Sequence, residues 1–81
     1  MAERINQRTN PLIGKNIFRL RMQKKMRTSD VLSALASRGI AVRSGAFTKI
    51  ENGANNPTVE MLIALTEILD CSFNDYFSDA F

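Results

Sequence analysis

Residues 47–58 read FTKIENGANNPT, and this stretch decides how the chain folds. Phe47 and Ile50 have the i, i+3 spacing that places two side chains on one side of a helix. Gly53 follows, and glycine commonly ends a helix because it adopts the left-handed conformation at low cost. A polar loop then leads to Thr58, whose hydroxyl can cap the start of another helix. The stretch therefore predicts two helices joined by a short polar loop.

Apolar residues at helical spacing extend this pattern in both directions. They predict four helices at about residues 12–25, 28–38, 44–52 and 58–70. Thr28 or Ser29 can cap the second of these helices. The spacing of Ser72 and Asp75 is that of a capping box, which predicts a fifth, short helix in which Phe73 and Phe77 close the core. The residues expected to be buried are Ile17, Leu20, Leu35, Phe47, Ile50, Leu62, Leu65 and Leu69. Because no strand pattern is present, we predict a compact all-α fold of five helices.

The composition excludes several classes of protein. A chain of 81 residues is expected to form one small domain, which we place at residues 12–78 after a flexible basic arm at residues 1–11. Cys71 is the only cysteine and histidine is absent, so we expect no metal, no cofactor and no catalytic residues. No apolar run reaches the roughly 20 residues of a membrane span, and the first ten residues lack a signal-peptide core. We therefore expect a cytoplasmic protein without a membrane segment.

Charge is divided unevenly along the chain. All eleven lysines and arginines lie within residues 1–49, beside two acidic residues, which leaves this part at +9. Residues 51–81 hold the other six acidic side chains and no basic ones. A basic half is typical of a surface that meets a polyanion, although it can also be a solvated face without a partner.

In the order and spacing of its signals, the chain resembles the Cro/phage-repressor type of helix-turn-helix DNA-binding domain, the XRE family. The resemblance covers about residues 12–77. Its most specific part is Ile50-Glu51-Asn52-Gly53, Pro57-Thr58, the apolar helix at 62–69, Ser72-Phe73 and Phe77, with Leu20-Arg21 upstream. It implies a lambda-repressor-like fold whose third helix enters the major groove of double-stranded DNA.

The resemblance also implies the roles of individual residues. The outward side of the third helix would contact bases through Arg43, Ser44, Gly45, Thr48 and Lys49. Contacts to phosphate would come from Lys15, Asn16, Thr28, Asn52, Asn55 and Asn56. For Asn55 and Asn56 a plain turn role is an equal alternative, because asparagine is a common turn residue. Arg21 and Glu51 would form an ion pair that ties the first helix to the third.

Two features depart from the family pattern. The link between the second and third helices is longer than in the shortest family members, and it contains Gly39-Ile40. Gly45 is a weak helix former, at a cost of ~1 kcal/mol relative to alanine, and it offers no side chain to a base. Both features affect how the third helix would meet DNA.

Three kinds of function remain to be weighed. The first is a transcriptional regulator that binds its operator as a homodimer, which we expect to form through the acidic C-terminal end with Tyr76 and Phe81. The alternative is an antitoxin-like or antirepressor-like module that mainly binds a partner protein, such as a toxin, through Phe18, Met22, Tyr76, Phe77 and Phe81. An enzyme is the weakest reading, because no nucleophile and base pair is present.

Overall fold

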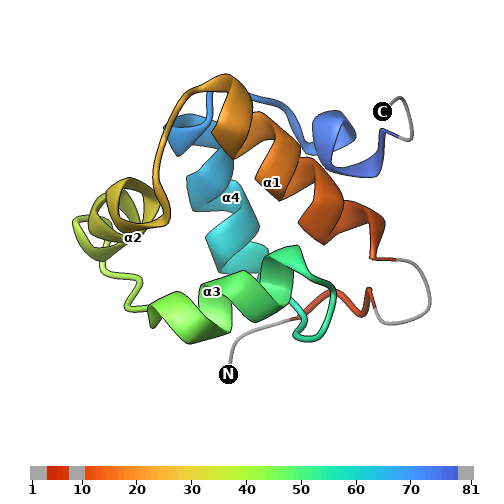
Figure 1. Cartoon of the computed structure of the whole chain (residues 1–81), viewed down its shortest axis with the longest axis horizontal. Coiled ribbons are helices and arrows are strands. Elements are labelled where there is room, and N and C mark those ends of the chain that lie inside the picture. Colours follow the sequence, from red (N-terminus) through yellow and green to blue (C-terminus); the bar gives the residue numbers. More distant parts are fainter. Residues whose placement is uncertain (1–3, 8–10, 79–81) are drawn as a thin grey trace.

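The computed structural model describes residues 4–7 and 11–78, which form four α-helices and one 3₁₀ helix (Figure 1). The elements are α1 (Leu12–Gln23), α2 (Thr28–Ala36), α3 (Ser44–Glu51), α4 (Val59–Ile68) and η1 (Phe73–Phe77). Within the described residues the only β-type pairing is an isolated antiparallel bridge between Arg4 and Thr58. The all-α prediction is confirmed. The expected fifth helix is present only as the 3₁₀ helix η1.

Local signals placed the starts of the four α-helices and the end of α3 to within one residue. Gly53 follows α3 with φ of +85°, the left-handed conformation predicted for it, and Gly39 follows α2 in the same conformation with φ of +79°. Thr58 caps α4, because its hydroxyl oxygen accepts a hydrogen bond from the Met61 N–H at 3.0 Å. In contrast, α1, α2 and α4 each end two residues earlier than predicted. Lys25 and Asp70, which follow α1 and α4, have positive φ of 57° and 52°, which ends an α-helix as glycine would.

The start of α2 differs from the prediction that Thr28 or Ser29 caps it. Arg27 occupies the N-cap position, and Thr28 is the first helical residue. An arginine side chain cannot accept a hydrogen bond from the helix. Asp30 instead accepts one from the Arg27 backbone N–H at 2.9 Å, which is one half of a capping box. The capping prediction for Thr28 and Ser29 was therefore wrong.

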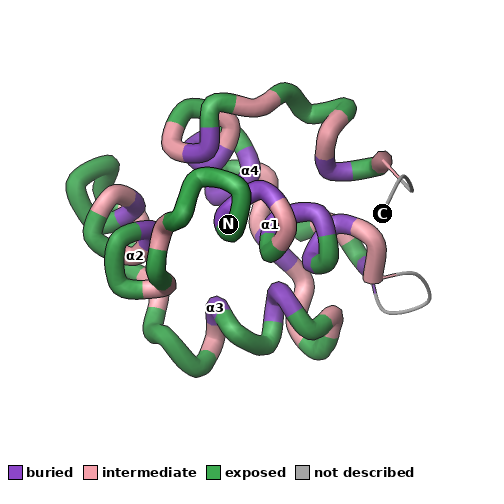
Figure 2. Tube along the Cα trace, turned by 45° about the horizontal axis from the view of Figure 1, so that its top comes forward, coloured by how far each residue is buried: buried purple, intermediate pink, exposed green. Residues whose placement is uncertain are grey.

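The helices enclose one hydrophobic core. α1 packs against α3 and η1, and α4 packs against α2 and η1. Figure 2 shows buried and exposed residues alternating along α3, as expected for a helix with one side against the core. All eight residues predicted to be buried are in this core, and it also contains Ile13, Val31, Met61, Ala64 and Tyr76. None of the helices in the described part of the chain has the length and hydrophobicity needed to span a bilayer.

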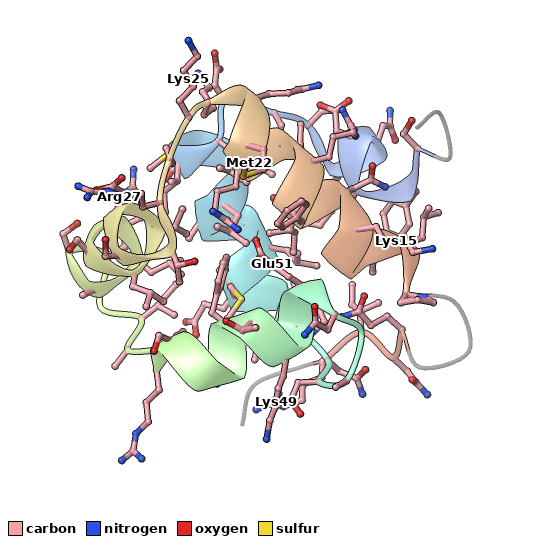
Figure 3. All side chains as sticks on the ribbon, viewed as in Figure 1. Lys15, Met22, Lys25, Arg27, Lys49 and Glu51 are labelled. Carbon is pink, nitrogen blue, oxygen red and sulfur yellow. The ribbon has the colours of Figure 1, made fainter. Side chains whose placement is uncertain are left out.

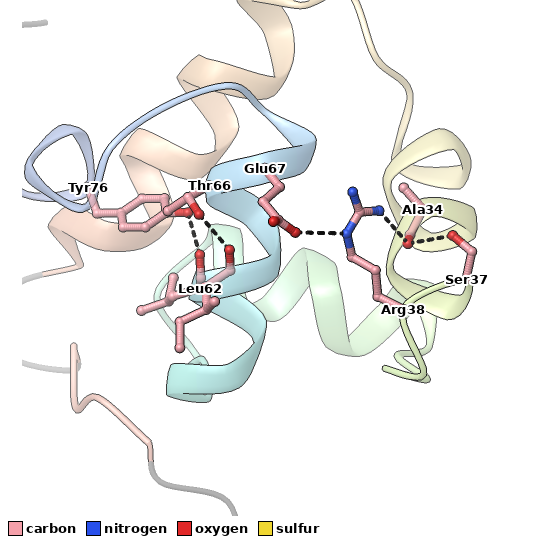
Figure 4. Close-up of polar contacts among 8 residues, drawn as sticks. Ala34, Ser37, Arg38, Leu62, Thr66, Glu67 and Tyr76 are labelled. Atoms are coloured by element: carbon pink, nitrogen blue, oxygen red, sulfur yellow. Dashed lines mark hydrogen bonds and ion pairs between the residues drawn. The ribbon is translucent and has the colours of Figure 1, made fainter.

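Aromatic residues of η1 pack differently from the prediction. Tyr76 is fully buried, whereas Phe73 and Phe77 are 38% and 50% exposed. A 3₁₀ helix has three residues per turn, so Phe73 and Tyr76 share one side and Phe77 is rotated away. The Tyr76 hydroxyl donates to the Leu62 carbonyl oxygen at 2.8 Å (Figure 4). Burial raises the pKa of this hydroxyl, which keeps it a neutral donor. The prediction that Phe73 and Phe77 close the core was therefore wrong, and Tyr76 is the residue of η1 that closes it.

Asn16 holds η1 against α1. Its side chain is fully buried, and its amide N–H groups donate to the carbonyl oxygens of Tyr76 and Ser78 at 2.8 and 2.7 Å. Its amide oxygen accepts hydrogen bonds from Arg19 at 3.0 and 3.2 Å. A side chain with these partners cannot reach a phosphate. The predicted phosphate contact by Asn16 is therefore wrong, because the residue belongs to the interior of the fold.

Residues 4–7 also differ from the free arm expected for residues 1–11. Gln7 is 1% exposed, and its amide group donates to the carbonyl oxygens of Ile50 and Asn55, both at 2.8 Å. Its amide oxygen accepts from the Gly14 N–H at 2.8 Å, one of the N–H groups that a helix start leaves without a partner. Gln7 thus connects the start of α1 to the end of α3. The remaining positions of the predicted arm, including Arg8, lie outside the described residues.

Replacing Gln7 with alanine is expected to lower the free energy of unfolding by about 1–3 kcal/mol, because the Gly14 N–H and the carbonyl oxygens of Ile50 and Asn55 each lose a hydrogen bond. Urea denaturation would measure the loss. Gln23→Ala on the exposed side of α1 is the matched control and should change stability little. Equal effects of the two substitutions would contradict a structural role for Gln7.

Candidate nucleic-acid interface

One side of α3 is buried against the core, and the opposite side is exposed to solvent. Phe47 and Ile50 are buried in the core, with exposures of 0% and 4%. The five residues predicted to contact bases all lie on the exposed side: Arg43, Ser44, Gly45, Thr48 and Lys49. Lys49 points away from the body of the domain (Figure 3). All five residues are therefore accessible, four of them on the outward side of α3 and Arg43 at its N-cap.

A buried ion pair fixes the end of α3. Arg21 Nε donates to Glu51 Oε2 at 2.8 Å and Arg21 Nη2 to Glu51 Oε1 at 3.1 Å, in a two-pronged arrangement. Arg21 Nη1 also donates to the Met26 carbonyl oxygen at 3.0 Å. Arg21 is 8% exposed and Glu51 9% exposed. The predicted Arg21–Glu51 pair is confirmed, and it keeps the only carboxylate of α3 off the exposed face.

Gly14 allows α1 to approach α3 closely. A Cβ atom at this position would overlap the backbone carbonyl oxygen atoms of Ile50 and Glu51. Glycine in a helix interior costs roughly 0.5–1 kcal/mol relative to alanine, and the close backbone contact explains why it is used here. Gly14, Gln7 and Arg21 therefore hold the C-terminal end of α3 at three points.

Basic side chains fall into two groups by their partners. Several lie beside carboxylates of the domain: Arg21 with Glu51, Lys24 with Asp70 at 3.8 Å, Arg27 with Asp30 at 3.7 Å, and Arg38 with Glu67 at 3.3 Å (Figure 4). In contrast, Arg43 at the N-cap of α3 and Lys49 within α3 have no acidic partner among residues 4–7 and 11–78, and neither has Lys15 on α1. The exposed face of α3 therefore carries positive charge that the described part of the domain does not neutralise.

The predicted phosphate-contacting residues are spread around α3. Thr28 is half-buried at the start of α2, and Asn52 is exposed as the C-cap of α3. Lys15 is exposed on α1 and points in a different direction from Lys49 (Figure 3). Lys15 and Asn52 line the same surface groove. Of the six predicted residues, Asn16 alone is fully buried.

Asn55 and Asn56 form the loop that leads to α4, and Gln7 binds both of them. Gln7 donates from its amide group to the Asn55 carbonyl oxygen, and from its backbone N–H to the Asn56 amide oxygen at 3.0 Å. The Asn56 carbonyl oxygen accepts from Arg4 at 2.8 Å. Both asparagines are half-buried. These contacts favour a structural role for Asn56, with its side-chain oxygen already occupied.

Two residues that position α3 were absent from the sequence prediction. Gln7 lies in a polar segment without helical periodicity, so nothing local marks it as buried. Gly14 lies inside a predicted helix, where an isolated glycine is a signal of close packing that could have been used. Both residues act on the same end of α3 as the Arg21–Glu51 pair.

Comparisons of the chain with protein-family models, curated proteins and solved structures gave no match.

Proposed function

We propose that the chain is a sequence-specific, DNA-binding transcriptional regulator of the Cro/phage-repressor helix-turn-helix type. α2 and α3 are the helix-turn-helix, within a lambda-repressor-like arrangement of α1 to α4 and η1. The observation that carries this proposal is the exposed face of α3, where Arg43 and Lys49 have no acidic partner in the described residues and Glu51 is turned inward. A helix fits the major groove, whose base edges distinguish all four base pairs.

Each residue of this face has a defined role in the proposal. Lys49 and Arg43 donate to the O6 and N7 atoms of guanine, which accept hydrogen bonds from basic side chains. Ser44 and Thr48 bond to base edges as donors or acceptors. Gly45 adds no base-specific contact, and its missing side chain lets the helix backbone approach the groove.

Contacts to the DNA backbone supply most of the affinity in the proposal. The backbone N–H groups at the start of α2, next to Thr28, carry the partial positive charge that favours phosphate. Asn52 and Lys15 contact phosphate at the other end of α3, with Asn55 beside them. Because phosphate contacts carry no base information, they set the position of α3.

We further propose that two copies bind a near-palindromic operator in the cytoplasm. Half-sites one DNA turn apart are expected for a two-fold symmetric dimer of this type. The acidic C-terminal end is the proposed interface, and its exposed aromatic residues are Phe73 and Phe77. Tyr76, which the sequence suggested for this interface, is buried inside the domain, and Phe81 lies outside the described residues.

Selection of bound sites from random duplex DNA tests the proposal. We expect enrichment of one near-palindromic site. The charge-reversed variant Arg43→Glu/Lys49→Glu should bind no site, and because both residues are exposed it should remain folded. Failure of the wild-type chain to enrich any sequence would contradict sequence-specific binding.

Lys49→Ala and Thr28→Ala are expected to fail in different ways. Removing the Lys49 side chain should cost about 1–3 kcal/mol of binding free energy, mainly on the preferred site, because the variant can no longer donate to a base edge. Removing the Thr28 side chain should weaken preferred and random sites alike, because phosphate is the same in every sequence. Fluorescence anisotropy on both kinds of duplex would measure this, with thermal melts as the folding control. Equal weakening on both duplexes for Lys49→Ala would make Lys49 a phosphate contact.

A protein-binding module, such as an antitoxin or antirepressor, is the second candidate. It is favoured by the exposure of Phe18 and Met22, at 48% and 53%. Isolated apolar residues on a surface are common, but these two are neighbours on one helix face. In this case the affinity for DNA would be low and would change little with salt.

A further inference from the structure

An open groove runs along the side of α1 that faces the end of α3. Its volume is about 700 Å³, and its lining includes Phe18, Met22, Lys15 and Asn52. Phe18 and Met22 are one helical turn apart, so their side chains form a continuous apolar ridge. Figure 3 shows Met22 and Lys15 toward opposite ends of α1. The groove is separate from the outward face of α3.

The Phe18 side chain in the groove is held in place by a contact with Arg21. The Arg21 guanidinium lies 5.2 Å from the centre of the Phe18 ring, within the range of a cation–π contact. Arg21 is in turn bound to Glu51 and to the Met26 carbonyl oxygen. Phe18 therefore rests on a buried group whose three nitrogen atoms each donate a hydrogen bond. An apolar ligand would meet a preformed surface, which reduces the entropy lost on binding.

The rim of the groove is basic. Lys15 is exposed and has no acidic partner among the described residues. Glu51 is the only acidic residue in the lining, and both of its carboxylate oxygens are bound to Arg21. The groove thus combines the apolar side chains of Phe18 and Met22 with the positive charge of Lys15. This pattern is complementary to a ligand that is both apolar and acidic.

We propose that this groove binds an acidic, amphipathic helical segment of a partner protein. Two large apolar side chains of that segment, three or four residues apart, pack on Phe18 and Met22, as in other helix-in-groove complexes. Its carboxylates bind Lys15 and the side-chain N–H groups of Asn52. The inference rests on the proposed function in one respect: Lys15 and Asn52 are also proposed phosphate contacts, so the segment and DNA exclude one another.

A second copy of this chain fits the groove less well. In the described part of the chain, exposed acidic and large apolar side chains occur together on η1, with Phe73, Phe77 and Asp75, and on α4, where Ile63 is the only exposed large apolar residue. A single apolar residue cannot cover both Phe18 and Met22. At three residues per turn, side chains four residues apart point about 120° away from each other. Phe73 and Phe77 therefore do not form the single ridge that Phe18 and Met22 require.

Selection from a displayed library of random peptides, roughly 15 residues or about four helical turns long, tests the groove directly. The selected peptides should be rich in Asp and Glu, with two large apolar residues three or four positions apart. Their affinity should fall at least about tenfold for Met22→Ser, which removes apolar contact area. Ile63→Ser, at an equally exposed residue of α4, is the matched control and should bind normally. Absence of enrichment, basic peptides, or unchanged binding to Met22→Ser would overturn the proposal.

Competition with DNA tests the mutual exclusion. A selected peptide, labelled and bound to the wild-type chain, should be released as the preferred duplex is added, and Lys15→Ala should weaken peptide binding. A ternary complex of chain, peptide and duplex would overturn the exclusion. If the chain binds no duplex at all, the proposed function fails, while the peptide selection still decides the groove. Light scattering of the wild-type chain and of Met22→Ser would measure the oligomeric state. If the wild-type chain is a dimer and Met22→Ser is a monomer, the groove is occupied by a second copy, and the proposal is overturned.

Discussion

Arg21→Met is expected to lower the free energy of unfolding by about 3–5 kcal/mol, because it leaves a buried carboxylate without its partner. Glu51 is 9% exposed and receives both of its charged hydrogen bonds from Arg21, at 2.8 and 3.1 Å. The Met26 carbonyl oxygen loses a donor in the same substitution. A decrease of this size is a large part of the stability of a small domain. Urea denaturation of the wild-type chain and the variant would measure it.

The double variant Arg21→Met/Glu51→Leu is the matched control. Replacing a buried ion pair by apolar residues of similar size is often neutral, or stabilises a protein by about 1–4 kcal/mol. We therefore expect the double variant to be more stable than Arg21→Met alone. A double variant as unstable as the single one would show that the cost comes from the missing packing of the arginine. The DNA affinity of a stable double variant would then report how far the ion pair positions α3.

Affinity for DNA is expected to fall by about 10³–10⁵ between 50 and 200 mM salt, if a dimer binds about 6–10 phosphates. Each bound phosphate releases condensed counterions from DNA, and this release is less favourable at high salt. The expectation rests on three basic side chains of the proposed DNA-binding surface that have no acidic partner in the described part of the domain, Lys15, Arg43 and Lys49.

The salt dependence would be measured by anisotropy titrations at several salt concentrations on one duplex. Lys15→Ala should reduce the slope of log affinity against log salt by about two, because each of the two copies in the dimer loses one basic partner of a phosphate. Lys25→Ala is the control: this lysine is exposed in the turn after α1, and we assign it no role in DNA binding. An affinity that hardly changes over this range would instead favour the protein-binding module.

The sequence alone determined the elements with strong local signals. Helical spacing correctly identified eight core residues, and Gly53 and Thr58 marked the end of α3 and the start of α4 where the structure has them. These signals act between residues a few positions apart, so their physical basis does not depend on the rest of the fold. The exposed face of α3 follows in the same way, because burial of Phe47 and Ile50 leaves the opposite side free.

Tertiary structure decided what depends on contacts between distant segments. Asn16 and Gln7 are polar residues with no apolar pattern that marks them as buried, yet both are buried because carbonyl groups far away in the sequence accept their N–H groups. Tyr76 is the buried aromatic residue of η1 for two reasons. The 3₁₀ geometry turns it toward the core, and the Leu62 carbonyl oxygen accepts a hydrogen bond from its hydroxyl. A buried polar group is stable only where a partner is in place, and its neighbours in sequence do not reveal that partner. Only the folded chain therefore showed which polar residues hold α3 in position and which remain available to a ligand.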